Sequence, residues 1–282
     1  MTDAICLTPD EEALLKSEGL DSVGGAFAHD RGERMDKPGL HHRERLRLRL
    51  TDGAGGEVHW YLKRYGPPLA ETGSHHCCGG AHDAGRVSPA EAELANIRLL
   101  TEAGVPTMRP IAFGSQKDLW GTVRSYLIVE AVAGQALERC FGDYFARHGA
   151  DATAMGAFNA ALVDLVAKLH GAGLVHRDLY ASHVFLHESP DGPVLSVIDL
   201  ARAFAPRWRR FRWRVKDLAQ LRYSMPADWA DIYWADFLDA YLARLGGGRR
   251  RLAAAVERKV AAMRRRARRK RSRRGDPAGS TT

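Results

Sequence analysis

The stretch Leu174-Val175-His176-Arg177-Asp178-Leu179-Tyr180-Ala181-Ser182-His183-Val184-Phe185-Leu186 decides the fold, together with Val197-Ile198-Asp199-Leu200. Two apolar runs, residues 184–186 and 195–198, flank the turn-rich sequence 189–193 and predict a β-hairpin. A hairpin fixes the register of its strands. It should therefore bring Asp178, just before the first strand, close to Asp199 at the end of the second.

A pair of carboxylates suits phosphoryl transfer, because one orients or deprotonates the attacking hydroxyl while the other binds Mg²⁺ against the phosphates. The tetrapeptide His-Arg-Asp-Leu at 176–179 resembles the catalytic loop of the protein kinase-like fold. The alternative is a chance tripeptide before a buried hairpin. The spacing to Asp199 and the amphipathic helix predicted over 158–169 disfavour it, so we expect Asp178 to be catalytic and Asp199 to bind metal.

Four residues depart from the pattern of the protein kinases. His183 stands where an Asn is usual, Tyr180 where a Lys is usual in serine/threonine kinases, and Leu200-Ala201 follow the second aspartate in place of Phe-Gly. With these departures, His-Arg-Asp-Leu-Tyr-x-x-His, Ile-Asp-Leu and Arg-Val-Lys-Asp-Leu-Ala-x-Leu resemble the bacterial lipopolysaccharide kinases, which comprise Kdo kinases and core heptose kinases. The resemblance covers residues 30–245 and is strongest over 170–225.

This resemblance implies an α+β, two-lobed protein kinase-like fold. Residues 1–130 are expected to form an N-terminal lobe with an antiparallel sheet and one helix, interrupted by a mobile insertion at 66–89. Residues 131–248 should form a mainly helical catalytic lobe, and residues 249–282 a basic, disordered tail. A helix over 251–266 is the alternative for the first part of this tail, whereas the like-charge block 264–274 is expected to be disordered.

Two adjacent antiparallel strands are predicted in the first lobe. Residues 45–50 alternate Arg and Leu with period two, a glycine-containing turn follows at 51–56, and residues 58–65 are again strand-like. The resemblance places Lys63, in the second strand, where a lysine contacts the phosphates of ATP. The alternative is an ordinary solvated lysine.

A helix is predicted from Ser88-Pro89 to Gly104. Glu93 shares a face with the apolar residues four and seven positions later, so we expect it to point inward and to pair with Lys63, whereas Glu91 should be more exposed.

Three further residues are candidates for nucleotide binding. The phosphate-covering loop is expected near Gly39, with Gly24-Gly25 as the alternative, and neither forms Gly-x-Gly-x-x-Gly. Glu130 and Val132 belong to the expected link between the lobes, whose backbone bonds adenine in kinases. An ordinary strand-end carboxylate remains the alternative for Glu130. His183 either completes the metal site or, as we prefer, positions Asp178, because Mg²⁺ favours oxygen ligands.

Composition places the chain in a reducing compartment. The N-terminus lacks the order of a signal peptide, and the four cysteines are sparse, so we expect a cytoplasmic protein that can also lie peripherally on the inner membrane. A zinc site in the insertion is disfavoured because its neighbouring ligands lack the usual gaps. These residues are His75, His76, Cys77, Cys78 and His82.

The net charge of +8 is a property of the tail. Residues 249–282 hold 14 Lys and Arg against two acids, which leaves 28 basic and 32 acidic residues before them. Residues 207–216 add six cations and three aromatics, a composition that suits a membrane surface, stacked bases or an anionic glycolipid. Aromatics packed inward beneath a basic surface are the alternative. We expect an anionic membrane before nucleic acid as the tail's partner.

The sequence therefore predicts an enzyme, an ATP- and Mg²⁺-dependent kinase that phosphorylates a sugar hydroxyl of a lipopolysaccharide inner core, Kdo or heptose, or of a similar glycolipid. Only seventeen residues separate Asp199 from Asp217, too few for the long activation segment of protein kinases, which argues against peptide substrates. Two alternatives stay open. One is a kinase-like binding module without turnover, and the other is an atypical kinase acting on small molecules or proteins.

Overall fold

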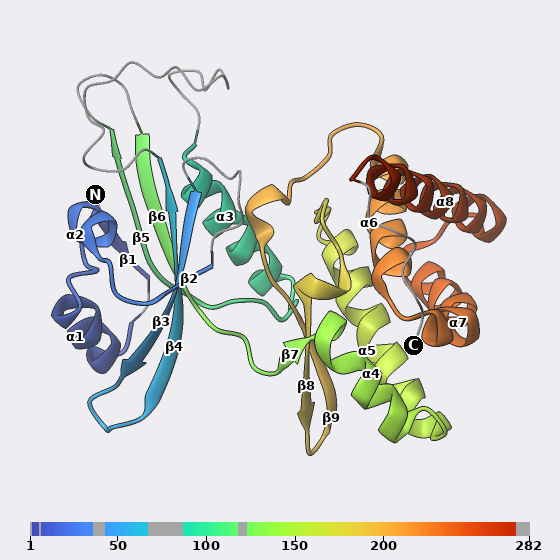
Figure 1. Cartoon of the computed structure of the whole chain (residues 1–282), viewed down its shortest axis with the longest axis horizontal. Coiled ribbons are helices and arrows are strands. Elements are labelled where there is room, and N and C mark those ends of the chain that lie inside the picture. The colour runs from blue at the N-terminus through green and yellow to red at the C-terminus, as the bar shows by residue number, and fades with distance from the viewer. Residues whose placement is uncertain (1, 6, 36–42, 67–86, 118–122, 275–282) are drawn as a thin grey trace. The chain divides into compact units, whose positions relative to one another are not determined.

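The computed structural model describes residues 2–5, 7–35, 43–66, 87–117 and 123–274 (Figure 1). Gly39 and most of the expected insertion lie outside the described residues. The chain divides into two compact units. Unit 1 comprises Met1–Leu99 and Thr107–Val132, and unit 2 comprises Leu100–Pro106 and Ala133–Thr282.

Unit 1 is built on a six-stranded antiparallel sheet with the strand order β1-β5-β6-β4-β3-β2. The strands are β1 (Thr2–Ala4), β2 (Glu33–Arg34), β3 (Arg43–Thr51), β4 (Glu57–Tyr65), β5 (Pro110–Lys117) and β6 (Val123–Glu130). The two strands predicted from residues 45–65 are β3 and β4, paired with Leu48 opposite Trp60.

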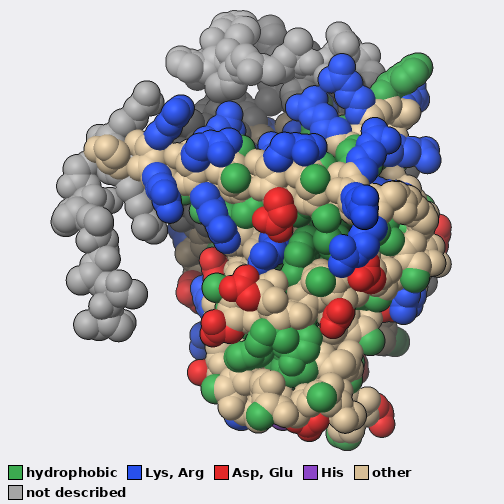
Figure 2. Space-filling view, turned by 90° about the vertical axis from the view of Figure 1, so that its right-hand side faces the viewer, with side chains coloured by type: hydrophobic (Ala, Val, Ile, Leu, Met, Phe, Trp, Pro, Cys, Tyr) green, Lys and Arg blue, Asp and Glu red, His purple; other side chains and the backbone are tan. Residues whose placement is uncertain are grey.

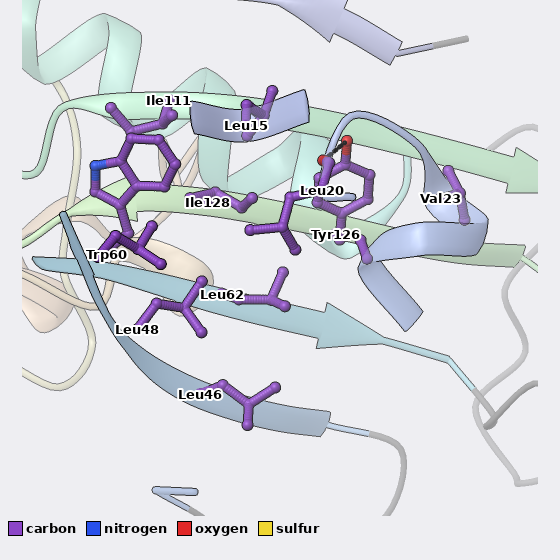
Figure 3. Close-up of a cluster of buried hydrophobic side chains, with 13 residues drawn as sticks. Leu15, Leu20, Val23, Leu46, Leu48, Trp60, Leu62, Ile111, Tyr126 and Ile128 are labelled. Atoms are coloured by element: carbon purple, nitrogen blue, oxygen red, sulfur yellow. Dashed lines mark hydrogen bonds between the residues drawn. The ribbon is translucent and has the colours of Figure 1, made fainter. Parts of the chain in front are cut away.

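One face of this sheet is covered by two short helices, α1 (Pro9–Ser17) and α2 (Val23–Ala28). Alternate residues of β3 and β4 point into the cluster shown in Figure 3, where Trp60 and Leu62 are fully buried. The Tyr126 hydroxyl donates to the Leu20 carbonyl at 3.1 Å, which fixes the chain between the two helices against the sheet.

The sequence signals at the two short helices differ in strength. Helix α1 has a capping box, because the Thr8 side chain accepts from Glu11 N–H and the Glu11 carboxylate accepts from Thr8 N–H. Helix α2 was not predicted, and Gly24-Gly25 lies within it. These glycines are therefore part of a helix packed on the sheet and form no phosphate-covering loop.

Helix α3 (Pro89–Glu102) begins as the sequence predicted. Ser88 Oγ accepts from Glu91 N–H at 3.2 Å, and the chain turns away at Gly104, whose φ of +68° suits a residue without a Cβ. Glu91 is exposed and Glu93 is fully buried, as expected from their positions around the helix.

Unit 2 contains the predicted hairpin, β8 (Val184–Ser189) and β9 (Gly192–Val197), with Pro190-Asp191 as its two-residue turn. The short strand β7 (Gln135–Ala136) pairs with β8. The remaining elements are α4 (Leu137–His148), α5 (Ala152–Gly171), η2 (Ala181–His183), η3 (Leu200–Arg202), α6 (Arg210–Ser224), α7 (Ala227–Leu245) and α8 (Arg249–Arg274).

Helix α5 is the central helix of unit 2 and packs against α7 and β9. Its apolar face, including Phe158, Leu162 and Val166, is buried among the aromatic side chains of α4 and α7. Its length and composition alone would allow it to cross a membrane, with half of the relevant window buried inside the unit. A core helix of this kind passes the same test.

Residues 249–274 form α8, so the helix considered over 251–266 is present and the prediction of disorder for the block 264–274 is wrong. Leu252, Val256 and Val260 recur at helical spacing, are buried, and pack the helix against α6. Their apolar contacts supply the free energy that the run of like charges alone could not. Residues 275–282 lie outside the described part of the chain.

Candidate active site

The loop that carries Asp178 is held by a buried carboxylate on α6. Asp217 is fully buried, and its two oxygens accept from the backbone N–H groups of His176 at 2.7 Å and Arg177 at 2.8 Å. The His170 ring lies 3.3 Å from the same carboxylate. Arg177 has φ +70°, an uncommon conformation for a residue with a side chain, and these bonds hold it there. Asp217 thus has a structural role, because it orients the loop that carries Asp178.

His176 fixes the loop from the inside. Its buried ring accepts from Asp178 N–H through Nδ1 at 3.3 Å and donates from Nε2 to the Ile198 carbonyl at 2.9 Å. Burial lowers the pKa of His176 below its ordinary value, so the ring is neutral near pH 7. One neutral imidazole therefore ties the residue before Asp199 to the backbone of Asp178.

His183 lies between the two predicted carboxylates. Its Nδ1 is 2.7 Å from the Asp178 carbonyl oxygen, which can only accept, so Nδ1 carries the proton. Its Nε2 faces Asp199 Oδ2 at 3.8 Å. The ring is stacked on His176. This geometry agrees with the preferred positioning role for His183 and leaves Nε2 directed toward the carboxylate expected to bind metal.

Asp199 follows β9 in a left-handed conformation, with φ +62° and ψ +61°. The backbone N–H of Ile198 donates to the His183 carbonyl at 3.0 Å, so the end of β9 and the loop are locked together. The side chains of Asp178 and Asp199 are each about one-fifth exposed. The hairpin thus brings both carboxylates to one region of unit 2, as the sequence predicted.

Asp178 also has a cationic neighbour that sequence reasoning missed. Arg202, at the end of the single turn η3, donates from Nη1 to Asp178 Oδ2 at 2.7 Å. The only sequence signal was its position three residues after Asp199, which by itself says nothing about a contact 24 residues back along the chain.

In unit 1, Lys63 and Glu93 form the ion pair that was expected. Lys63 Nζ lies 2.5 Å from Glu93 Oε1, and both side chains are buried. Tyr65, two residues after Lys63 and on the same face of β4, donates its hydroxyl to Glu93 Oε2 at 2.7 Å. Both oxygens of a fully buried carboxylate therefore have donors, which offsets its loss of hydration. Because side chains alternate along a strand, the sequence could have indicated that Tyr65 lies on the same face as Lys63.

The remaining candidates for nucleotide binding are less defined. The Glu130 carboxylate accepts from Arg109 Nε at 2.8 Å, and Arg109 also pairs with Glu11, which is the ordinary ion-paired arrangement at a strand end. Val132 is half-buried. Gly39 falls outside the described residues, so its assignment stays a prediction.

The basic and aromatic stretch 207–216 combines both alternatives considered from the sequence. Trp213 is half-buried against Phe204, with the Arg177 guanidinium over its ring, whereas Trp208 is 82% exposed. Phe211 is partly covered by Arg251 of α8, 4.6 Å from its ring centre. One aromatic ring therefore supports the loop, and one is available at the surface.

Comparisons with known proteins agree on a single family. The model of the lipopolysaccharide kinase (Kdo/WaaP) family matches residues 82–241. The lipopolysaccharide core heptose(I) kinases WaaP of Pseudomonas aeruginosa and of Escherichia coli K12 are each 35% identical, over 139 and 140 residues, or 48% of this chain. The matched part spans about half, 52%, of the length of these relatives.

A solved structure of WaaP in complex with acyl carrier protein is also similar. It has a TM-score of 0.65 and 27% sequence identity, with 92% of this chain and 98% of that chain covered. The two-lobed kinase-like fold predicted from the sequence is thereby confirmed.

We expect Asp217→Ala to lower the free energy of unfolding by about 2–6 kcal/mol, because two buried backbone N–H groups lose their acceptor at about 1–3 kcal/mol each. Chemical denaturation measures the change. Asp236→Ala, which removes an exposed acid from α7, is the control and should change stability by less than about 0.5 kcal/mol. Equal effects of the two substitutions would contradict the role given to Asp217.

We expect Tyr65→Phe to destabilise the protein by about 1–3 kcal/mol, because Glu93 Oε2 is left buried without its donor. The matched control is Tyr61→Phe on the same strand, since no hydrogen bond of the Tyr61 hydroxyl is found among the described residues. Denaturant midpoints compare the two variants. A Tyr65→Phe protein as stable as Tyr61→Phe would show that the phenol contributes nothing to holding Glu93.

Proposed function

Because the chain belongs to the lipopolysaccharide kinase (Kdo/WaaP) family, we propose that it is an ATP- and Mg²⁺-dependent phosphotransferase. Its proposed acceptor is a sugar hydroxyl, of Kdo or heptose, in a lipopolysaccharide inner core. The observation that carries the proposal is the fixed pair Asp178 and Asp199, joined through His183 and His176. Phosphoryl transfer is mostly a matter of positioning and charge stabilisation, which such a rigid pair can supply.

Asp178 is assigned the acceptor hydroxyl. Its Oδ2 is held by Arg202, which leaves Oδ1 to orient the hydroxyl. As the hydroxyl oxygen bonds to the γ-phosphorus of ATP, the bond from that phosphorus to the β,γ-bridging oxygen breaks, ADP leaves, and Oδ1 receives the hydroxyl proton. His183 and His176 bind the backbone of Asp178 and keep its carboxylate in place. In the proposed step the acceptor hydroxyl lies within hydrogen-bonding distance of Asp178 Oδ1.

Asp199 is assigned the magnesium ion, which when bound would neutralise charge on the phosphates. Mg²⁺ is commonly held by one or two carboxylates together with phosphate oxygens and water, so a single carboxylate fits this cation. Among the described residues no three His, Cys, Asp or Glu side chains form a complete metal site. We give His183 the positioning role because its Nδ1 bonds the Asp178 carbonyl, and its Nε2 lies 3.8 Å from Asp199 Oδ2.

We assign Lys63 the role of binding the phosphates of ATP. The Glu93 carboxylate holds one side of its ammonium group, and Tyr65 fixes that carboxylate in turn. For adenine we propose the backbone of residues 130–132, because the Glu130 side chain is already engaged by Arg109. Gly39 stays the proposed position of the phosphate-covering loop.

We also propose that the protein lies at the cytoplasmic face of the inner membrane and that α8 attracts it there. Lys and Arg side chains gather along the upper part of the face shown in Figure 2, where α8 lies. Ten of them are exposed and described: Arg249, Arg250, Arg251, Arg258, Lys259, Arg264, Arg265, Arg266, Arg268 and Arg269. An acyl carrier protein, as in the complex of the solved relative, is a further partner to test on this surface.

The catalytic assignment predicts that Asp178→Asn lowers kcat by about 10²–10⁴-fold, the usual contribution of a positioned general base. ADP release is measured with Mg-ATP and heptosylated Kdo-lipid A as acceptor. Asp191→Asn, in the hairpin turn, is the control and should retain wild-type turnover. Near-normal ADP release by Asp178→Asn would remove Asp178 from the mechanism.

The same assay separates the enzyme from the alternatives. Mg-ATP that raises the melting temperature without any turnover would favour a kinase-like binding module. Turnover with a protein or small-molecule acceptor but none with Kdo-lipid A or heptosylated core would change the substrate class. A wild-type protein that binds no Mg-ATP would disprove the proposed kinase activity.

The membrane proposal predicts that the triple variant Arg265→Gln, Arg266→Gln and Arg269→Gln binds anionic vesicles about 100-fold more weakly, at about 1 kcal/mol for each cation. Cosedimentation with phosphatidylcholine vesicles, with and without phosphatidylglycerol, measures the change. Arg31→Gln, Arg49→Gln and Arg98→Gln, exposed in unit 1, form a control of equal charge. Equal binding by both triple variants, or stronger binding to RNA than to vesicles, would contradict the proposal.

A further inference from the structure

Arg202 is placed by the same turn that places Asp199. Asp199 adopts the left-handed conformation, η3 makes a single turn over Leu200–Arg202, and Arg202 then reaches back to Asp178. Among the described residues, the Asp178 carboxylate is the only side chain that Arg202 hydrogen-bonds, and Arg202 is the only side chain that hydrogen-bonds this carboxylate. The contact is therefore specific to the carboxylate that is assigned the acceptor hydroxyl.

The contact with Asp178 occupies only one nitrogen of the Arg202 guanidinium. Arginine has five N–H donors in a planar fork, and Nη1 alone binds Asp178 Oδ2. The Arg202 side chain is 49% exposed, against 22% for Asp178. A guanidinium with exposed donors next to a reacting group can bind a second oxyanion, and its fork matches carboxylate and phosphate.

The surrounding sequence also favours an acidic ligand. Residues 200–216 contain no acid and seven cations: Arg202, Arg207, Arg209, Arg210, Arg212, Arg214 and Lys216. Lys216 approaches the loop itself, because its ammonium group donates to the Arg177 carbonyl. Burial lowers the pKa of Lys216, and the positive charges of Arg202 and Arg177 also lower it, whereas the carboxylates of Asp178 and Asp217 raise it.

We propose that Arg202 determines acceptor specificity by binding a carboxylate or phosphate group of the acceptor while one of its nitrogens positions Asp178. The acceptor would then be a sugar with an acidic group close to the hydroxyl that is phosphorylated. The inference rests on the proposed function, since it takes Asp178 as the group that meets the acceptor.

The first test compares the kinetics of Arg202→Gln and wild type with Mg-ATP and heptosylated Kdo-lipid A. Loss of a charge-assisted contact should raise the KM for the acceptor by about 10- to 100-fold and leave the KM for ATP within about twofold. Arg202→Lys, which keeps the charge but not the fork, should recover part of the loss.

The matched control is Arg244→Gln. Arg244 is 45% exposed and pairs with Asp164. The substitution therefore removes a similar surface ion pair that does not involve Asp178. It should behave as wild type in both KM values. Melting temperatures of both variants show whether each is folded.

The second test removes the acidic groups from the acceptor. Two forms are used, one with its carboxyl groups reduced to alcohols and one with its phosphates removed. The form lacking the recognised group should bind wild type at least about 10-fold more weakly but bind Arg202→Gln no more weakly than the intact acceptor does. The two forms thereby identify which oxyanion is recognised.

Acceptor binding is also measured by calorimetry, so the result does not depend on turnover. If wild type binds the intact acceptor but releases no ADP, the proposed function fails while the binding data still test Arg202. A fall in kcat with unchanged acceptor KM would reduce Arg202 to a positioning residue of Asp178 and overturn the specificity role. Equal sensitivity of wild type and Arg202→Gln to both modified acceptors would also overturn it.

Discussion

The buried carboxylate of Asp217 is the constraint on which the geometry of the candidate site depends. It has no access to solvent and is satisfied by the backbone of His176 and Arg177. Because an unsatisfied buried charge is very unfavourable, the loop must present those two N–H groups to it. This forces the left-handed turn at Arg177 and thereby sets the direction in which Asp178 leaves the loop.

Histidine rings extend this constraint from the loop to the hairpin. His176 bonds the Ile198 carbonyl, and His183 bonds the Asp178 carbonyl while it faces Asp199. In each case a ring nitrogen bonds the backbone, so the carboxylates remain available for chemistry. Hydrogen bonds from the two rings to the backbone therefore hold the two acids in one region without pairing their carboxylates with each other.

In unit 1 a buried cation, Lys63, is likewise stabilised by hydrogen-bonded partners. Lys63 would be unfavourable in its buried position without Glu93, and Glu93 would be unfavourable without the second donor from Tyr65. A strand places Lys63 and Tyr65 on one face because its side chains alternate, and α3 places Glu93 against them. A strand and a helix thus hold Lys63, Glu93 and Tyr65 in mutual hydrogen-bonding positions.

Residues with strong local patterns could be assigned from the sequence. The alternation of β3 and β4, the inward position of Glu93 and the hairpin after Asp178 each follow from a period or a turn of a few residues. Helix α2 could not be assigned, since two glycines favour a turn locally and only packing on the sheet makes them helical. Likewise α8 was obscured by its charge, because three buried side chains outweigh the repulsion.

By itself, then, the sequence determined the two-lobed fold, the strand pairs β3–β4 and β8–β9, and the helix α3. It also identified Lys63, Glu93, Asp178 and Asp199 as candidate functional residues. Only the tertiary structure decided that Tyr65 completes the bonding of Glu93, that Arg202 holds Asp178, and that His183 bonds a carbonyl. Local periodicity determines which face a residue occupies, but a hydrogen bond between distant residues depends on distances that only the packed chain establishes.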